Sequence, residues 1–122
     1  MSDKPTVLLA EDEAMLRLLA VEMLQDAGFE VFEAADGAEG LEVLKAHPEI
    51  SLLVSDIKMP RMDGYALAEA GLALKPDLKV LLMTGYAQVP PPARLRQADI
   101  PILHKPFNLE RLCALAAELT HS

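Results

Sequence analysis

The stretch most informative about the fold is residues 51–60, Ser51-Leu52-Leu53-Val54-Ser55-Asp56-Ile57-Lys58-Met59-Pro60. The apolar run at 52–54 predicts a central strand from Ser51 to Ser55, because a strand covered on both faces carries apolar side chains without alternation. Asp56 begins a loop that extends to Asp63, and a helix is expected from Gly64 to about Leu74. A strand, a loop and a helix in this order form one unit of an α/β fold.

The same unit recurs along the chain. Short runs typical of strands begin near Val7, Val31, Leu52, Val80 and Ile102, and the intervals between them carry apolar residues at helical spacing. Strands that alternate with helices predict a parallel sheet with helices on both faces. The strand at 30–34 contains two glutamates, which favours a position at the edge of that sheet.

The expected helices are marked by apolar stripes and by residues that begin or end a helix. The first is expected to stop at Gly28 and to bury a stripe made of Met15, Leu18, Leu19, Met23 and Ala27. The second follows a turn at Asp36-Gly37 and ends before Pro48.

Two further helices are expected in the last third of the chain. A short one at 93–98 follows three prolines at 90–92, which cannot extend a helix interior. The last is capped by Asn108, and its stripe consists of Leu109, Leu112, Cys113, Ala116 and Leu119.

Composition narrows the possible functions. The chain has 122 residues, 11 basic and 19 acidic side chains and a net charge of −8, so residues 1–122 predict one domain. The acidity disfavours nucleic acid and anionic membranes as partners, because both attract Lys and Arg. The lone Cys113 excludes an internal disulfide and a cysteine zinc cluster. No apolar run approaches the roughly 18 residues of a membrane span, and a cytoplasmic location is expected.

Polar residues follow four of the expected strands. Glu11 and Asp12 come after the first, Asp56 after the third, Thr84 after the fourth and Lys105 after the fifth. Parallel strands bring their carboxyl ends to one edge, where ligands bind. If the first and third strands are neighbours, three carboxylates converge there and repel one another. A hard divalent cation would offset that repulsion, and Mg²⁺ fits better than zinc because no His or Cys accompanies them.

These residue types also suit phosphoryl transfer. An aspartate carboxylate can act as a nucleophile and form an aspartyl phosphate, and it needs no general base because it is already ionised. Mg²⁺ and Lys105 would stabilise charge on the transferring oxygens. Thr84 would donate a hydrogen bond to the new phosphate.

In this order, the motifs resemble those of the two-component response-regulator receiver domains of the chemotaxis-receiver type. The resemblance extends over essentially the whole chain and implies a flavodoxin-like fold with strand order 2-1-3-4-5. The matching residues are Glu11-Asp12, Asp56 within residues 55–60, Met62-Asp63-Gly64, Thr84-Gly85 and Lys105-Pro106-Phe107.

The resemblance also assigns roles. It implies that Asp56 accepts a phosphoryl group from a histidine kinase or a histidine phosphotransfer protein. It implies that Asp12, Asp56 and the backbone carbonyl of Lys58 bind Mg²⁺, that Glu11 acts mainly through water, and that Thr84 and Lys105 contact the phosphoryl group. Such a protein catalyses only its own phosphorylation and dephosphorylation. It signals by phosphorylation-dependent protein contact or by onward phosphotransfer.

Four positions depart from the family pattern or are candidates for tuning it. Glu11 replaces the more usual Asp, and Ile102 stands where the family places the aromatic residue of its switch. Tyr86 is either a substitute for that aromatic residue or a shield over the site. Lys58 either alters attack of water on the aspartyl phosphate or is a solvated loop residue.

The motifs favour a stand-alone receiver, and several other functions are alternatives to it. A Mg²⁺-dependent phosphatase with an aspartyl nucleophile would carry a second Asp where Lys58 stands. A flavin-binding flavodoxin would not place acidic residues in its first loop, because they repel phosphate. A phosphorylation-independent binding module and a receiver excised from a hybrid kinase are the remaining alternatives. The prolines at 90–92 favour a monomer or a weak dimer, because they shorten a common dimerisation surface.

Overall fold

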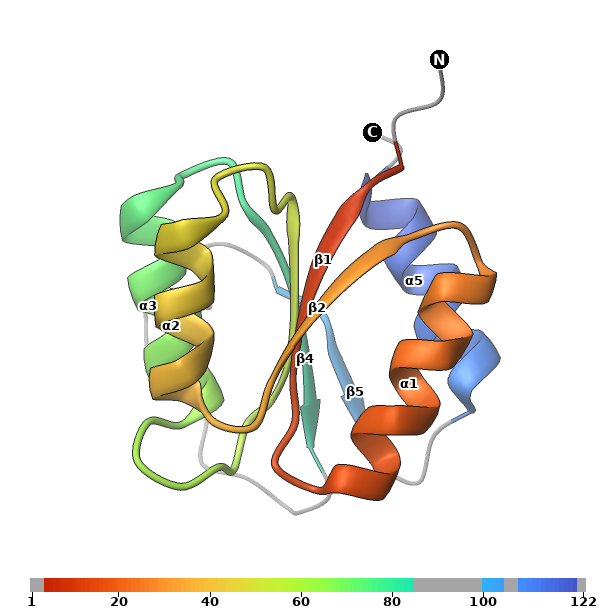
Figure 1. Ribbon diagram of the computed structural model, residues 1–122, viewed down its shortest axis with the longest axis horizontal. Helices are drawn as coiled ribbons and strands as arrows, with labels where there is room; N and C mark the ends of the chain where they lie inside the picture. The colour runs from red at the N-terminus through yellow and green to blue at the C-terminus, as the bar shows by residue number, and fades with distance from the viewer. Residues whose placement is uncertain (1–3, 85–99, 105–107, 121–122) are drawn as a thin grey trace.

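The strands of the protein form one parallel sheet, in a computed structural model that describes residues 4–84, 100–104 and 108–120 (Figure 1). The strands are β1 (Thr6–Ala10), β2 (Glu30–Ala34), β3 (Leu52–Asp56), β4 (Lys79–Thr84) and β5 (Ile102–His104). The helices are α1 (Ala14–Asp26), α2 (Gly37–Ala46), α3 (Gly64–Leu74) and α5 (Leu109–Thr120). The sheet order is β2-β1-β3-β4-β5, which confirms both the flavodoxin-like fold and the edge position of 30–34.

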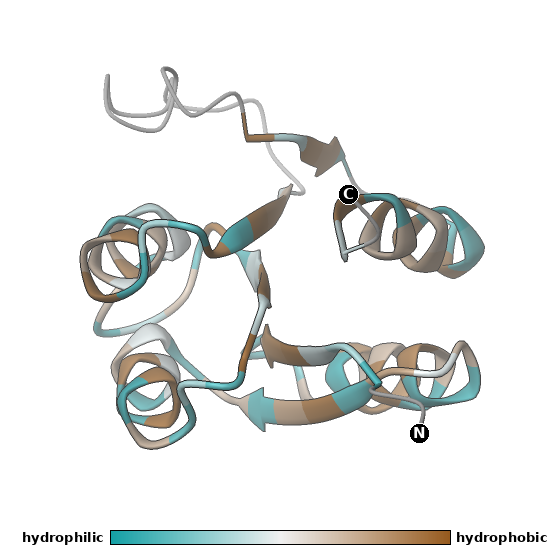
Figure 2. Cartoon of the chain, turned by 90° about the horizontal axis from the view of Figure 1, so that it is seen from above, coloured by the Kyte–Doolittle hydropathy of each residue, from teal (hydrophilic) through white to brown (hydrophobic). Residues whose placement is uncertain are grey.

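Helices cover both faces of the sheet. The helices α2 and α3 lie on one face and α1 and α5 on the other, as the view from above shows (Figure 2). The three inner strands are almost wholly buried because each has a helix layer above and below it. This explains why their sequences are continuous apolar runs.

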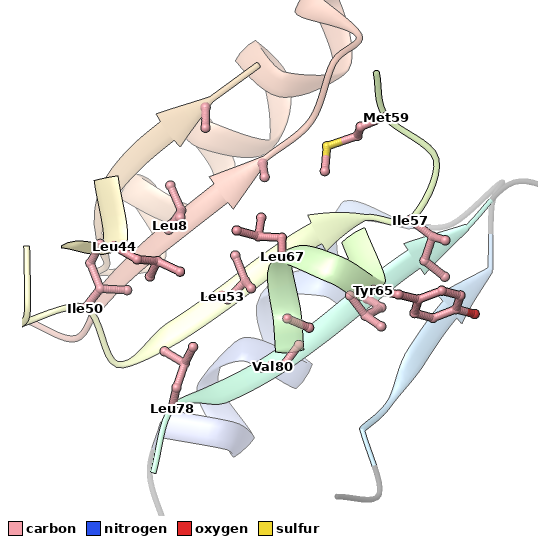
Figure 3. Close-up of a cluster of buried hydrophobic side chains, with 14 residues drawn as sticks. Leu8, Leu44, Ile50, Leu53, Ile57, Met59, Tyr65, Leu67, Leu78 and Val80 are labelled. Atoms are coloured by element: carbon pink, nitrogen blue, oxygen red, sulfur yellow. The ribbon is translucent and has the colours of Figure 1, made fainter. Parts of the chain in front are cut away.

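Each face of the sheet has its own hydrophobic cluster. The cluster under α2 and α3 includes Leu8, Leu53, Leu67 and Val80 (Figure 3). The cluster under α1 and α5 includes Leu9, Leu24, Val54 and Leu112. The expected stripe of the last helix is confirmed at its centre, since Leu112 and Ala116 are buried and its other members pack against the same cluster.

The predicted core stripe of the first helix is wrong. Helix α1 buries Ala20, Val21 and Leu24, whereas Leu18 is 54% exposed and Met15 and Leu19 are exposed as well. The helix is apolar around much of its circumference, so its sequence is compatible with more than one buried face. The sheet selects the face that carries the small Ala20 beside Val21 and Leu24.

The helix ends follow local chemistry. Gly28 takes a left-handed φ of 99° just after α1, as expected for a residue that stops a helix. Of the expected turn Asp36-Gly37, Gly37 is already the first residue of α2, and Asp36 caps the helix because its carboxylate accepts a hydrogen bond from the Glu39 amide at 2.8 Å. Asn108 accepts one from the Glu110 amide at 2.6 Å, which confirms its predicted role.

The short helix expected at 93–98 lies outside the described residues. Within the described parts of the chain, no helix has both the length and the apolar character that a membrane crossing requires.

Candidate functional site

Three functional side chains lie at the carboxyl edge of the sheet. Asp56 and Thr84 are the last residues of β3 and β4, and both are buried. Glu11 follows β1, and its amide donates to the Ala34 carbonyl at 3.0 Å. Because β1 lies beside β3 with Ala10 opposite Ser55, Glu11 and Asp56 come next to one another. The sequence predicted that the carboxylates converge if the first and third strands are neighbours, and the sheet order shows that they are.

Glu11, Asp12 and Asp56 form an acidic cluster. Each offers a carboxylate oxygen, and these oxygens all lie within 4.8 Å of one another. Glu11 is 1% exposed and Asp56 7%, while Asp12 is open to solvent. Carboxylates this close repel one another when they are ionised, and a cation bound between them would offset that repulsion. An all-oxygen donor set with this charge fits a hard divalent cation such as Mg²⁺.

The loop between β1 and α1 holds Glu11 in place. One carboxylate oxygen of Glu11 accepts a hydrogen bond from the Glu13 amide at 3.0 Å. Arg17 donates to the Glu11 carbonyl at 2.8 Å and, through Nε, to the Glu33 carboxylate on β2 at 3.1 Å. The sequence pattern did not indicate this role of Arg17, because no local pattern pairs it with Glu33, sixteen residues away.

The loop between β3 and α3 returns tightly beneath Asp56. The Gly64 amide donates to the Ile57 carbonyl at 2.7 Å, and the Ile57 amide donates to the Met83 carbonyl at 2.9 Å. The side chains of Ile57 and Met59 are buried in the cluster under α2 and α3 (Figure 3). The loop is therefore anchored on its apolar side.

The outer half of the same loop rests on the start of α2. Arg61 donates to Asp36 Oδ2 through Nη2 at 2.6 Å and through Nε at 3.2 Å. The hydrogen bond from the Glu39 amide, followed by the Arg61 guanidinium, holds the pKa of the Asp36 carboxyl below its usual value. A Cβ atom placed on Gly37 would lie 2.2 Å from the Met62 carbonyl oxygen, so only glycine permits this approach.

The remaining predicted residues are less central or lie elsewhere. Lys58 is exposed on the β3–α3 loop. Ile102 lies on β5, is partly buried and packs against the cluster under α2 and α3. Tyr86 and Lys105 lie outside the described residues, as do Gly85 and the pair Pro106-Phe107.

The protein is thus a doubly wound α/β domain with a cluster of three carboxylates at the carboxyl edge of its sheet. Residues 7–117 match the response regulator receiver domain family, and the chain belongs to that family. The resemblance inferred from its motifs is thus confirmed.

Two curated relatives and one solved structure illustrate the similarity. The chain is 41% identical over 107 residues to the response regulator receiver protein CpdR of Brucella abortus (strain 2308), covering 87% of this chain and 88% of CpdR. It is 38% identical over 121 residues to the sensor kinase CckA of the same organism, covering 98% of this chain and 13% of CckA. A response regulator receiver protein from Sinorhizobium medicae WSM419 superimposes with a TM-score of 0.85 at 31% identity, covering 98% and 97% of the two chains.

Proposed function

We propose that this receiver domain accepts a phosphoryl group on Asp56 from a phosphohistidine, in a reaction that requires Mg²⁺. The observation that carries the proposal is the placement of Asp56, buried at the end of β3 with the carboxylates of Glu11 and Asp12 close by. A nucleophile in this position is oriented by the strand and lies next to carboxylates that could hold a cation.

The chemical step needs few groups. One carboxylate oxygen of Asp56 forms a bond to phosphorus as the bond from phosphorus to the donor imidazole nitrogen breaks, and the imidazole leaves with that electron pair. When bound, Mg²⁺ neutralises negative charge on the phosphoryl oxygens. Asp12, Asp56 and the backbone carbonyl of Lys58 would hold it, and Glu11 would act through a water molecule.

Thr84 and Lys105 complete the proposed site. Thr84 is buried at the end of β4, next to the strand that carries Asp56, and its hydroxyl would donate to the phosphoryl group. Lys105 would supply a positive charge to the same oxygens. Tyr86 would report phosphorylation in place of an aromatic residue at Ile102, whose aliphatic side chain packs in the core.

The donor is proposed to be a histidine kinase or a histidine phosphotransfer protein. Similarity to a sensor kinase, CckA, and to a receiver protein, CpdR, supports a place in such a relay. The output would be a protein contact or onward transfer of the phosphoryl group, and the location would be the cytoplasm.

Phosphorylation by a small donor tests the proposal. Incubation with radiolabelled acetyl phosphate and Mg²⁺ should label the wild-type protein, and hydroxylamine should remove the label because it cleaves acyl phosphates. The variant Asp56→Asn should take up no label. The matched control is Asp63→Asn, seven residues later in the same loop, whose cap to the Ala66 amide an asparagine can replace. Label on Asp56→Asn, or an unlabelled wild type, would overturn the assignment.

A further inference from the structure

We infer that the Asp36–Arg61 ion pair positions the β3–α3 loop for cation binding, so that these two residues set the Mg²⁺ affinity of the site without touching the ion. The inference rests on the proposed function, because it concerns the same site. Neither residue belongs to the acidic cluster of Glu11, Asp12 and Asp56.

Asp36 is a rigid anchor. Its Oδ1 accepts the hydrogen bond from the Glu39 amide that begins α2, and its Oδ2 accepts both hydrogen bonds from Arg61. Glu39 in turn accepts a hydrogen bond from the Ala35 amide at 2.5 Å. Both oxygens of Asp36 are therefore used, and its side chain is only 12% exposed. An anchor that is part of a helix cap has little freedom to move.

Arg61 is held in a conformation that side chains rarely adopt. Its φ is +70°, in the left-handed region, and it is the one non-glycine residue with positive φ in the described part of the chain. Such a backbone persists only where surrounding contacts determine it. Such contacts are the hydrogen bond from the Met62 amide to the Pro60 carbonyl across Arg61 and the two hydrogen bonds from the largely exposed Arg61 side chain to Asp36. Met62 also lies close against Gly37 at the start of α2.

These contacts bracket the segment that carries the proposed carbonyl ligand. On one side of Lys58, the Ile57 carbonyl accepts from the Gly64 amide at the sheet edge. On the other side, the Met62 amide donates to the Pro60 carbonyl at 2.8 Å, next to Arg61. The Lys58 carbonyl therefore lies between an inner anchor at the sheet and an outer anchor on α2. Removing the outer anchor frees this carbonyl to leave the position that a cation requires.

Three variants separate the ion pair from other roles of these residues. Asp36→Asn keeps an acceptor for the helix cap but removes the charge. Arg61→Gly removes the guanidinium and also relieves the left-handed backbone. Arg61→Lys keeps a positive charge but loses the two-pronged geometry. Lys45→Ala is the control, because it removes an exposed cation that lies 3.8 Å from Glu42 on α2.

The main measurement is Mg²⁺ binding by calorimetry, under conditions in which circular dichroism shows that each variant is fully folded. Loss of a group that orients a metal ligand weakens binding about 10-fold or more, so we expect about that loss for Asp36→Asn and Arg61→Gly. The double variant Asp36→Asn/Arg61→Gly should lose no more Mg²⁺ affinity than either single variant. Arg61→Lys should be intermediate and Lys45→Ala unchanged. Hydrogen exchange of the Met62 and Gly64 amides in the metal-free protein should accelerate in the same order.

The outcomes are distinguishable from those of the phosphorylation test. Wild-type Mg²⁺ affinity in both Asp36→Asn and Arg61→Gly, with or without a loss of stability, would overturn the positioning role. So would additive effects in the double variant. A wild-type protein that binds Mg²⁺ but takes no label would instead overturn the proposed function and leave the positioning role measurable.

Discussion

Gly64 lies against the backbone of Asp56 so closely that a Cβ atom on Gly64 would be 2.2 Å from the Asp56 carbonyl oxygen. The same glycine donates its amide to the Ile57 carbonyl. The start of α3 is thus packed directly on the end of β3, and the position of the proposed phosphoacceptor depends on a residue without a side chain.

Replacement of this glycine tests that dependence. Gly64→Ala should destabilise the fold by about 1–3 kcal/mol, because the clash is with backbone and cannot be relieved by a rotamer change. Urea unfolding measures this loss, and labelling by acetyl phosphate should fall with it. Gly40→Ala is the comparison, since a Cβ there would meet only the ends of two leucine side chains, Leu67 at 3.0 Å and Leu8 at 3.7 Å. Equal losses in the two variants would contradict the special role of Gly64.

Removal of one charge from the acidic cluster should stabilise the metal-free protein. Asp12→Asn should raise the free energy of unfolding by up to about 1 kcal/mol in a chelator, because fewer carboxylates then repel one another. With Mg²⁺ added, the wild type should be more stable than Asp12→Asn, since only the wild type keeps the full set of ligands. Urea unfolding with and without Mg²⁺ measures both effects. Asp77→Asn, at an exposed carboxylate outside the cluster, should respond to neither condition.

The hydrogen bonds that the Asp36 carboxylate accepts from the Glu39 amide and from Arg61 should make stability depend on pH in a defined direction. The pKa of Asp36 is lower in the folded protein than its ordinary value of 3.8, so the ionised form stabilises the fold above about pH 4. That contribution is lost as the pH falls through the lowered pKa. The wild type should therefore exceed Asp36→Asn in stability at pH 7, and the difference should shrink at pH 3. A difference that is constant across this range would contradict a pKa of Asp36 lowered by these contacts.

Truncation of two leucines on α1 should change stability by very different amounts. Leu24 is 0% exposed, so Leu24→Ala should cost about 2–5 kcal/mol through lost burial and a cavity. Leu18 lies on the exposed side, and Leu18→Ala should change stability by no more than about 0.5 kcal/mol. Thermal or urea unfolding of the two variants measures the contrast. A larger loss for Leu18→Ala would restore the face of α1 that its sequence first indicated.

Much of the molecule was predictable from local patterns. The run at 52–54, the interval to the next apolar run and the polar residues after each run indicate a parallel α/β sheet with a site at its carboxyl edge. The same patterns identified three candidate site residues, Asp56, Glu11 and Thr84. Strand ends in such a sheet lie at one edge because of its topology, which does not depend on detailed packing. Asn108 was predictable as a cap because capping uses atoms two or three residues away.

The strands, the carboxylates and the chemistry that they permit follow from the sequence, whereas other features depend on contacts between distant parts of the chain. The buried face of α1, the bridge from Arg17 to Glu33 and the pair formed by Asp36 and Arg61 emerged only in the fold. Each of these features depends on residues that are distant along the chain. The local sequence is compatible with several polar or apolar partners for each of them. Only the packing of helices and loops on the sheet determines which of those partners come within contact distance.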